Sequence, residues 1–232
     1  IGACGLLSFR VSKNLGSGEG GAILTDDPNL AQKAYACHNN ARPRKAVGYD
    51  FTYLGSRGAN LRMTEFQAAL LLSQMRRVEE RARIREENAR YRDSMLAEIP
   101  GIRPAKNHEG CTRNAYHLYM FRYSPERFAG LSRDVFIKAM RAEGIPCSAG
   151  YSPLNKEALV KNALDSRGFR KIFPPEQLAA WAERTQCPEN DKLCAESVWF
   201  SQTVLLGTRE QMEQIVAALK KVHSNAAALK TA

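Results

Sequence analysis

The sequence has few of the features that mark a membrane protein or a metal-binding protein. None of its apolar runs approaches the roughly 20 residues of a membrane-spanning helix, so no membrane association is predicted. Its six cysteines include no C-x-x-C pair and match no zinc-ligand spacing. We therefore expect no metal site, and we expect reduced, mostly buried thiols in a cytoplasmic protein.

A basic segment interleaved with aromatic residues is also missing. The net charge is +10, but the only compact basic patch, residues 42–45, contains no aromatic residue. Much of the remaining charge lies in 76–92, where opposite charges stand four residues apart, as on a solvated helix face. These patterns argue against nucleic-acid binding.

The most informative segment is residues 8–21, SFRVSKNLGSGEGG. It places Lys13 on a predicted turn between an apolar strand and a glycine-rich loop. Such a lysine is a candidate Schiff-base nucleophile, provided that partial desolvation keeps its amine neutral often enough to attack a carbonyl. The alternative is a solvated surface lysine beside glycines that only form turns. The glycines also spell G-x-G-x-x-G, but a strand is predicted after them instead of a helix, which excludes a dinucleotide-binding loop.

A second informative segment is residues 58–69, GANLRMTEFQAA. Thr64 and Gln67 are predicted to form a capping box that starts a helix. Asn60 and Arg62 come just before this helix, in a loop where polar side chains can point at a ligand. The alternative is that Asn60 only makes a turn and Arg62 pairs with a carboxylate.

The pattern of apolar residues predicts an alternation of strands and helices. Buried strands are expected at 6–9 and 22–25, and a helix capped by Asp27 is expected from 28 to about 38. A long helix is predicted from 64 to about 99, because no Pro or Gly interrupts it. Its first half is apolar and its second half highly charged, which indicates a helix that leaves one core and enters another.

Two further elements are predicted near the C-terminal end. Tyr119, Phe121 and Tyr123 alternate along a strand and would share one face. Thr208 and Gln211 form a second capping box, which would open an amphipathic terminal helix.

The two motif-bearing segments together resemble the DegT/DnrJ/EryC1/StrS family of sugar aminotransferases, which use pyridoxal 5'-phosphate (PLP). Its members carry segments like S-F-x-x-x-K-N-L-x-x-G-E-G-G and G-x-N-x-R-M-T-E-x-Q-A-A, and both match almost letter for letter. The resemblance implies an α/β protein of fold type I. Residues 1–78 would be the C-terminal part of the large, mostly parallel-sheet PLP-binding domain, and 79–232 the small C-terminal α/β domain. Relatives begin well before the lysine, so we expect the chain to be the C-terminal part of a longer enzyme.

The resemblance also implies roles for individual residues. Lys13 would form the Schiff base with PLP, and Ser8 would hydrogen-bond the cofactor phosphate. Asn60 would reach the phosphate of the neighbouring subunit, which implies a homodimer with a shared active site. Arg62 and Tyr151 are candidates for substrate binding.

The implied reaction moves an amino group from glutamate or glutamine to a keto-sugar, with a nucleotide-linked sugar as the main expectation. Two alternatives stay open: amination of a cyclitol or other carbocyclic ketone, and a non-catalytic fragment that dimerises or regulates. One branch of the family performs dehydration and replaces the lysine with histidine, so Lys13 favours transamination.

Overall fold

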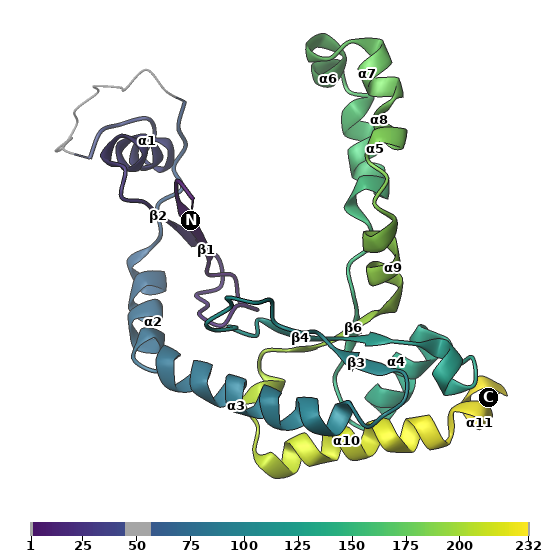
Figure 1. The fold of residues 1–232 in the computed structure, drawn as a ribbon. Helices are drawn as coiled ribbons and strands as arrows, with labels where there is room; N and C mark the ends of the chain where they lie inside the picture. Colours follow the sequence, from purple (N-terminus) through teal and green to yellow (C-terminus); the bar gives the residue numbers. More distant parts are fainter. Residues whose placement is uncertain (1, 45–56, 232) are drawn as a thin grey trace. The chain divides into compact units, whose positions relative to one another are not determined.

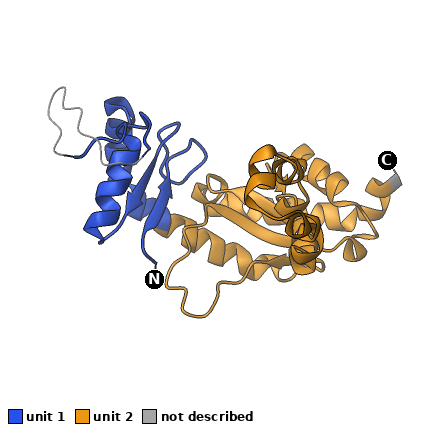
Figure 2. Ribbon diagram, turned by 90° about the horizontal axis from the view of Figure 1, so that it is seen from above, with its two compact units in different colours: residues 1–82 blue, residues 83–232 orange. Residues whose placement is uncertain are grey.

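The computed structural model describes residues 2–44 and 57–231 (Figure 1). The chain divides into two compact units, residues 1–82 and 83–232 (Figure 2). Lys45 of the basic patch lies outside the described residues. Within the described ranges, no helix is long and apolar enough to cross a membrane. Nor do three or more His, Cys, Asp or Glu side chains gather there in a way that could hold a metal ion.

Unit 1 opens with an antiparallel hairpin of β1 (Gly5–Ser8) and β2 (Gly21–Leu24). Both strands form where the sequence predicts them, but the prediction that they are buried is wrong. Leu6 and Ile23 face each other across the hairpin and are 73% and 52% exposed. A short apolar run predicts a strand, whereas its burial depends on a second layer that the run itself does not specify.

Helix α1 (Pro28–His38) follows the hairpin, and its predicted N-terminus is confirmed. The side chain of Asp27 accepts hydrogen bonds from the backbone N–H groups of Asn29 and Leu30. Cys37, on this helix, is exposed. All six cysteines are free and only Cys147 is buried, so the prediction of mostly buried thiols is wrong as well.

The long helix predicted from 64 to about 99 is in fact two helices. The capping box of Thr64 and Gln67 is confirmed at the start of α2 (Glu65–Met75), and α3 (Val78–Leu96) begins after a two-residue turn. The break falls where the composition changes from apolar to charged. With neither Pro nor Gly at this point, the sequence carries no local stop signal for the first helix.

Unit 2 is built on a four-stranded sheet in the order β3-β4-β6-β5, in which all pairs are antiparallel. Its strands are β3 (Ile102–Pro104), β4 (Leu118–Tyr123), β5 (Ser148–Ala149) and β6 (Ser197–Ser201). Since β1 and β2 are antiparallel too, the described residues contain no parallel strand pair. The mostly parallel sheet expected for the large domain is therefore not among them.

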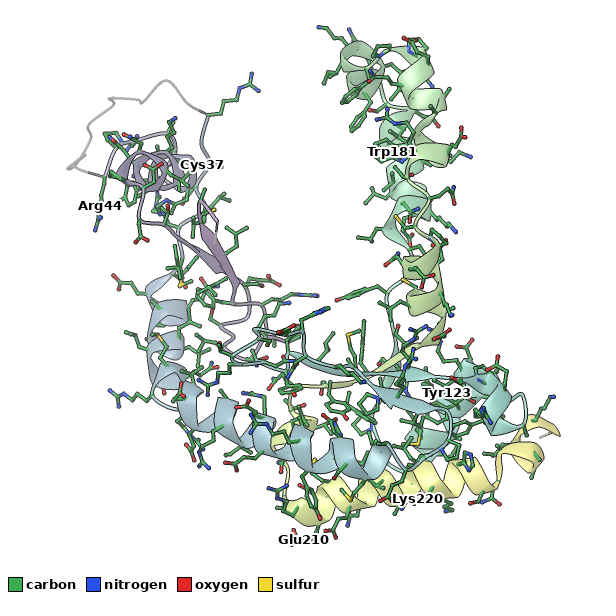
Figure 3. All side chains as sticks on the ribbon, in the orientation of Figure 1. Cys37, Arg44, Tyr123, Trp181, Glu210 and Lys220 are labelled. Carbon is green, nitrogen blue, oxygen red and sulfur yellow. The ribbon has the colours of Figure 1, made fainter. Side chains whose placement is uncertain are left out.

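The core of unit 2 lies between this sheet and helices α3, α4 (Arg133–Ala142) and α10 (Arg209–Ser224). The predicted alternation along β4 is confirmed, because Tyr119, Phe121 and Tyr123 are all buried. Tyr123, which Figure 3 labels, stacks on the ring of Phe136 from α4 at 4.3 Å between centroids. The Thr208–Gln211 capping box is also confirmed, at the start of α10.

Helix α3 contributes polar side chains to this core. Asn88 donates to the backbone carbonyls of Leu205 and Gly207 at 2.9 and 2.8 Å. Arg92 is fully buried, and its guanidinium lies 3.6 Å from the centroid of the Tyr119 ring. Burial lowers the pKa of Arg92, since the charged form loses its hydration.

The remaining helical elements are short. Between β5 and β6 the chain forms η2 (Leu154–Lys156), α5 (Ala158–Leu164), α6 (Arg167–Ile172), α7 (Pro175–Ala179), α8 (Trp181–Arg184) and α9 (Pro188–Glu196) (Figure 1). The others are η1 (Pro125–Phe128), η3 (Val204–Leu206) and α11 (Ala226–Thr231). The C-terminal segment is thus helical, and Ala226 in it is buried.

Candidate active site

Lys13 lies on a loop that continues the β1–β2 hairpin, residues 10–20, which we call the lysine loop. The hairpin pairing extends past the strands, because Phe9 N donates to Gly20 O at 2.9 Å and Val11 N to Gly18 O at 2.8 Å. At the turn itself, Lys13 N donates to Arg10 O at 2.9 Å. Lys13 is half-buried. The structure therefore presents this lysine on a hydrogen-bonded turn, as the sequence predicts.

Ser8 ends β1, five residues before the lysine, and is exposed. Its hydroxyl oxygen accepts a hydrogen bond from Arg10 N at 3.5 Å. A hydroxyl that accepts one hydrogen bond still has its own proton to donate. Ser8 can therefore donate to an anion beside the lysine loop.

Helix α2 contacts the lysine loop through two glutamines. Gln74 Nε2 donates to Gly16 O at 2.5 Å, and its Oε1 accepts from Gly16 N at 3.3 Å. Gln67 Nε2 donates to Glu19 O at 2.9 Å. The sequence pattern predicts Gln67 only as a cap residue and gives Gln74 no role. The available clue was their spacing of seven, which puts both on one face of the helix.

Asn60 and Arg62 lie in the segment before α2. This segment pairs with the C-terminal end of α1. Asn60 forms an isolated antiparallel bridge with Asn39. Arg62 Nη1 donates to the side-chain oxygen of Asn39 at 2.7 Å, so an amide orients it and not the carboxylate of the alternative interpretation. Both Asn60 and Arg62 are exposed. Asn39 was not predicted, and nothing in the local pattern identifies it.

The backbone beneath this segment leaves no room for a side chain at Gly58. A Cβ there would lie 2.3 Å from Ala41 N and 2.8 Å from Ala36 O. Ala41 itself has a φ of 62°, in the left-handed region. Gly58 is thus what allows the chain before Asn60 to approach the end of α1.

We expect Gly58→Ala to lower the free energy of unfolding by about 1–3 kcal/mol, the usual cost of overpacking. Because the clash is with backbone atoms, the segment carrying Asn60 and Arg62 must move. Urea denaturation measures the loss. Gly168→Ala is the matched control: a Cβ at Gly168, in α6, meets only Ser166 Oγ at 3.9 Å. Equal stability of the two variants would contradict the prediction.

Tyr151 belongs to unit 2 and is 70% exposed. Its ring packs edge-on against Trp199 of β6, with 4.9 Å between centroids. The other four predicted residues, Ser8, Lys13, Asn60 and Arg62, all belong to unit 1. Within unit 1, α2 connects their two segments, because it begins three residues after Arg62 and its glutamines contact the lysine loop.

The chain as a whole is similar to known proteins. The model of the DegT/DnrJ/EryC1/StrS aminotransferase family matches residues 1–220. The L-glutamine:2-deoxy-scyllo-inosose aminotransferase of Streptoalloteichus tenebrarius is 31% identical over 230 residues, which cover 96% of this chain and 53% of that protein. The protein of the same name from Streptomyces kanamyceticus is 31% identical over 237 residues, covering 99% and 55%. The chain thus spans about half the length of these curated relatives.

Solved structures agree with this match. The crystal structure of 3-amino-5-hydroxybenzoic acid synthase superimposes with a TM-score of 0.76 at 25% identity, over 96% of this chain and 54% of that one. A DegT DnrJ EryC1 StrS aminotransferase from Brucella abortus gives a TM-score of 0.73 at 22% identity, over 96% and 52%. The predicted α/β class and its relation to aminotransferases are confirmed. The chain belongs to the DegT/DnrJ/EryC1/StrS aminotransferase family.

Proposed function

We propose that the protein is a PLP-dependent aminotransferase that moves the amino group of L-glutamine to the ketone of a cyclitol such as 2-deoxy-scyllo-inosose. The observation that carries the proposal is Lys13 on its hydrogen-bonded turn, in a chain of an aminotransferase family. Donor and acceptor are taken from the names of two relatives, each 31% identical. Of the acceptor classes that the sequence leaves open, these names support a carbocyclic ketone over the nucleotide-linked sugar that was the main expectation.

The predicted site residues of unit 1 fit PLP chemically. Lys13 offers a primary amine for the aldehyde of the cofactor. The Ser8 hydroxyl, which accepts from Arg10 N, keeps its proton for a phosphate oxygen. Asn60 and Arg62 add amide and guanidinium donors that suit phosphate or carboxylate groups.

When bound, PLP would supply the electron sink for the charge that develops as the donor loses its α-proton. The protein's part is to move that proton. Lys13 Nζ would take it from the α-carbon of glutamine as general base and give it back as general acid. In the second half of the cycle, Lys13 Nζ would deliver a proton to the carbon that was the ketone carbon of the acceptor. The net reaction turns L-glutamine and a ketone into 2-oxoglutaramate and a primary amine, and it needs no oxidant.

The other residues would bind and orient. Ser8 would hold the phosphate, Arg62 would pair with a carboxylate of the donor, and Tyr151 would lie against the acceptor. Asn60 would reach the phosphate bound by a second copy, which makes the active site shared in a homodimer. Exposed apolar side chains on α2, such as Phe66 at 91%, support a protein contact at unit 1.

The domain assignment and the location of the protein are part of the same proposal. Residues 1–78 would belong to the large PLP-binding domain and residues 79–232 to the small domain. The protein would work in the cytoplasm, where free thiols such as the six here stay reduced.

The test uses the protein expressed from its complete reading frame. PLP is added, the mixture is reduced with borohydride, and the modified peptide is mapped by mass spectrometry. We expect a pyridoxyl group on Lys13. L-glutamine is then supplied with 2-deoxy-scyllo-inosose or with a nucleotide-linked keto-sugar, and 2-oxoglutaramate is measured.

Turnover with the cyclitol ketone and not with the nucleotide sugar is the expected result. The reverse preference would restore the nucleotide-sugar alternative. An unmodified Lys13 in a folded protein would contradict the aminotransferase proposal and favour a non-catalytic, dimerising role.

A further inference from the structure

We infer that Gln67 and Gln74 of α2 are positioning residues that clamp the lysine loop from one helix face and so fix where Lys13 presents its amine. The inference rests on the proposed function, because it assigns these glutamines a part in that reaction. Neither residue needs to touch substrate or cofactor. Each would act through the backbone of the loop.

Gln74 holds the loop on the C-terminal side of the lysine. Its amide both donates to Gly16 O, at 2.5 Å, and accepts from Gly16 N, at 3.3 Å. A side-chain amide offers a donor and an acceptor side by side, which matches the N–H and C=O of one backbone residue. Gly16 in turn packs closely on the turn, since a Cβ on it would lie 2.9 Å from Arg10 O. That same oxygen accepts the hydrogen bond from Lys13 N.

Gln67 holds the far end of the loop. Its Nε2 donates to Glu19 O at 2.9 Å, and Ser17 Oγ donates to the same oxygen at 3.1 Å. The next residue, Gly20, accepts from Phe9 N and closes the loop onto β1. Because Gln67 and Gln74 are seven positions apart, they lie about 10 Å apart along the helix. They therefore grip the loop at two separate points.

Capping the helix does not require the contact with Glu19. The capping box uses only the oxygen of Gln67, which accepts from Thr64 N at 3.0 Å. Gln211 makes the same box at the start of α10, accepting from Thr208 N at 2.9 Å. Gln67 and Gln211 thus each cap a helix in the same way, but only Gln67 is described as also donating from its Nε2 to the lysine loop. Gln211 therefore serves as a control for Gln67 within the same chain.

Fixing the loop matters because proton transfer depends on position. A displacement of about 1 Å at a reacting group costs on the order of 100-fold in rate. The loop has internal backbone bonds, but the two glutamines join it to a helix outside the hairpin. Loss of the clamp should therefore lower kcat and leave the binding of glutamine largely unchanged.

The experiment compares three variants in the protein expressed from its complete reading frame. Gln74→Met keeps the length of the side chain and removes both hydrogen bonds. Gln67→Glu keeps the capping acceptor, as Glu does in capping boxes, and replaces the donor with a charge facing a carbonyl. Gln211→Glu makes the same chemical change in unit 2 and is the matched control. Gln74→Glu, which loses only the donor, replaces Gln74→Met if that variant does not fold.

Hydrogen–deuterium exchange of residues 10–20 is measured without PLP, and kcat and KM for L-glutamine with it. We expect the Gln67 and Gln74 variants to speed exchange in the loop about tenfold, as loss of one or two hydrogen bonds implies. We expect kcat to fall about 10- to 100-fold, with KM changed less than threefold. Gln211→Glu should match the unmodified protein in every readout.

Two results would overturn the inference: loop exchange no faster than in Gln211→Glu, or faster exchange with an unchanged kcat. Failure of the proposed function looks different, since the unmodified protein would then form no pyridoxyl-Lys13 and show no turnover. That result would contradict the part of the inference that concerns kcat. The exchange data would still report whether the glutamines hold the loop.

Discussion

Lys13→Arg is expected to lower turnover by about 1,000-fold or more, which is within the range for loss of a general acid–base group. Arginine keeps the positive charge and much of the length of the side chain. Its guanidinium stays protonated at any working pH, so it neither forms a Schiff base nor accepts the α-proton. The turn is held by the backbone bond from Lys13 N to Arg10 O, which the substitution retains.

Two measurements check this result: 2-oxoglutaramate formed from L-glutamine, and the pyridoxyl label after borohydride reduction. Lys33→Arg is the control, because Lys33 is an exposed lysine of α1 in the same unit. It should keep full activity and leave the label on Lys13. A Lys13→Arg protein with more than a tenth of the original turnover would show that another group carries the proton.

Phe136→Ala is expected to destabilise unit 2 by about 3–5 kcal/mol, the usual range for a buried phenylalanine. Phe136 is fully buried on α4. Its ring stacks on Tyr123 at 4.3 Å and meets Phe128 edge-on at 5.5 Å between centroids. Truncation removes the ring from between helix and sheet and leaves a cavity that these large neighbours cannot easily fill.

Urea denaturation followed by near-ultraviolet circular dichroism reports this loss, because the signal comes from packed aromatic rings. Lys138→Ala lies two residues away on the same helix, is exposed, and should change stability by less than about 0.5 kcal/mol. A loss below 1 kcal/mol for Phe136→Ala would mean that this aromatic cluster is not the main support of unit 2.

The acceptor of the proposed reaction illustrates what a family resemblance leaves undecided. The two long motifs contain Lys13 and Asn60, which in the proposed reaction would serve the cofactor and not the acceptor. The names of the 31% identical relatives, not the motifs, favour a cyclitol over a nucleotide-linked sugar. Comparing the two acceptors directly is therefore the experiment that decides the substrate class.

The sequence alone determined the features that depend on neighbours a few residues away. The caps at Asp27, Thr64 and Thr208 were predictable because a short polar side chain bonds backbone groups two or three residues on. The buried face of β4 followed from an alternation of period two. Lys13 stood out because it lies between an apolar strand and a glycine-rich loop.

The tertiary structure decided everything that depends on distant partners. The helix break after Met75 and the exposure of β1 and β2 depend on which surfaces are available to pack, and no local pattern encodes that. Gln74 meets Gly16 across 58 residues of sequence, and Arg62 meets Asn39 across 23. Amide hydrogen bonds of this kind produce no periodic pattern in the sequence. A polar side chain can bond either to water or to a distant backbone group, and only the fold decides which.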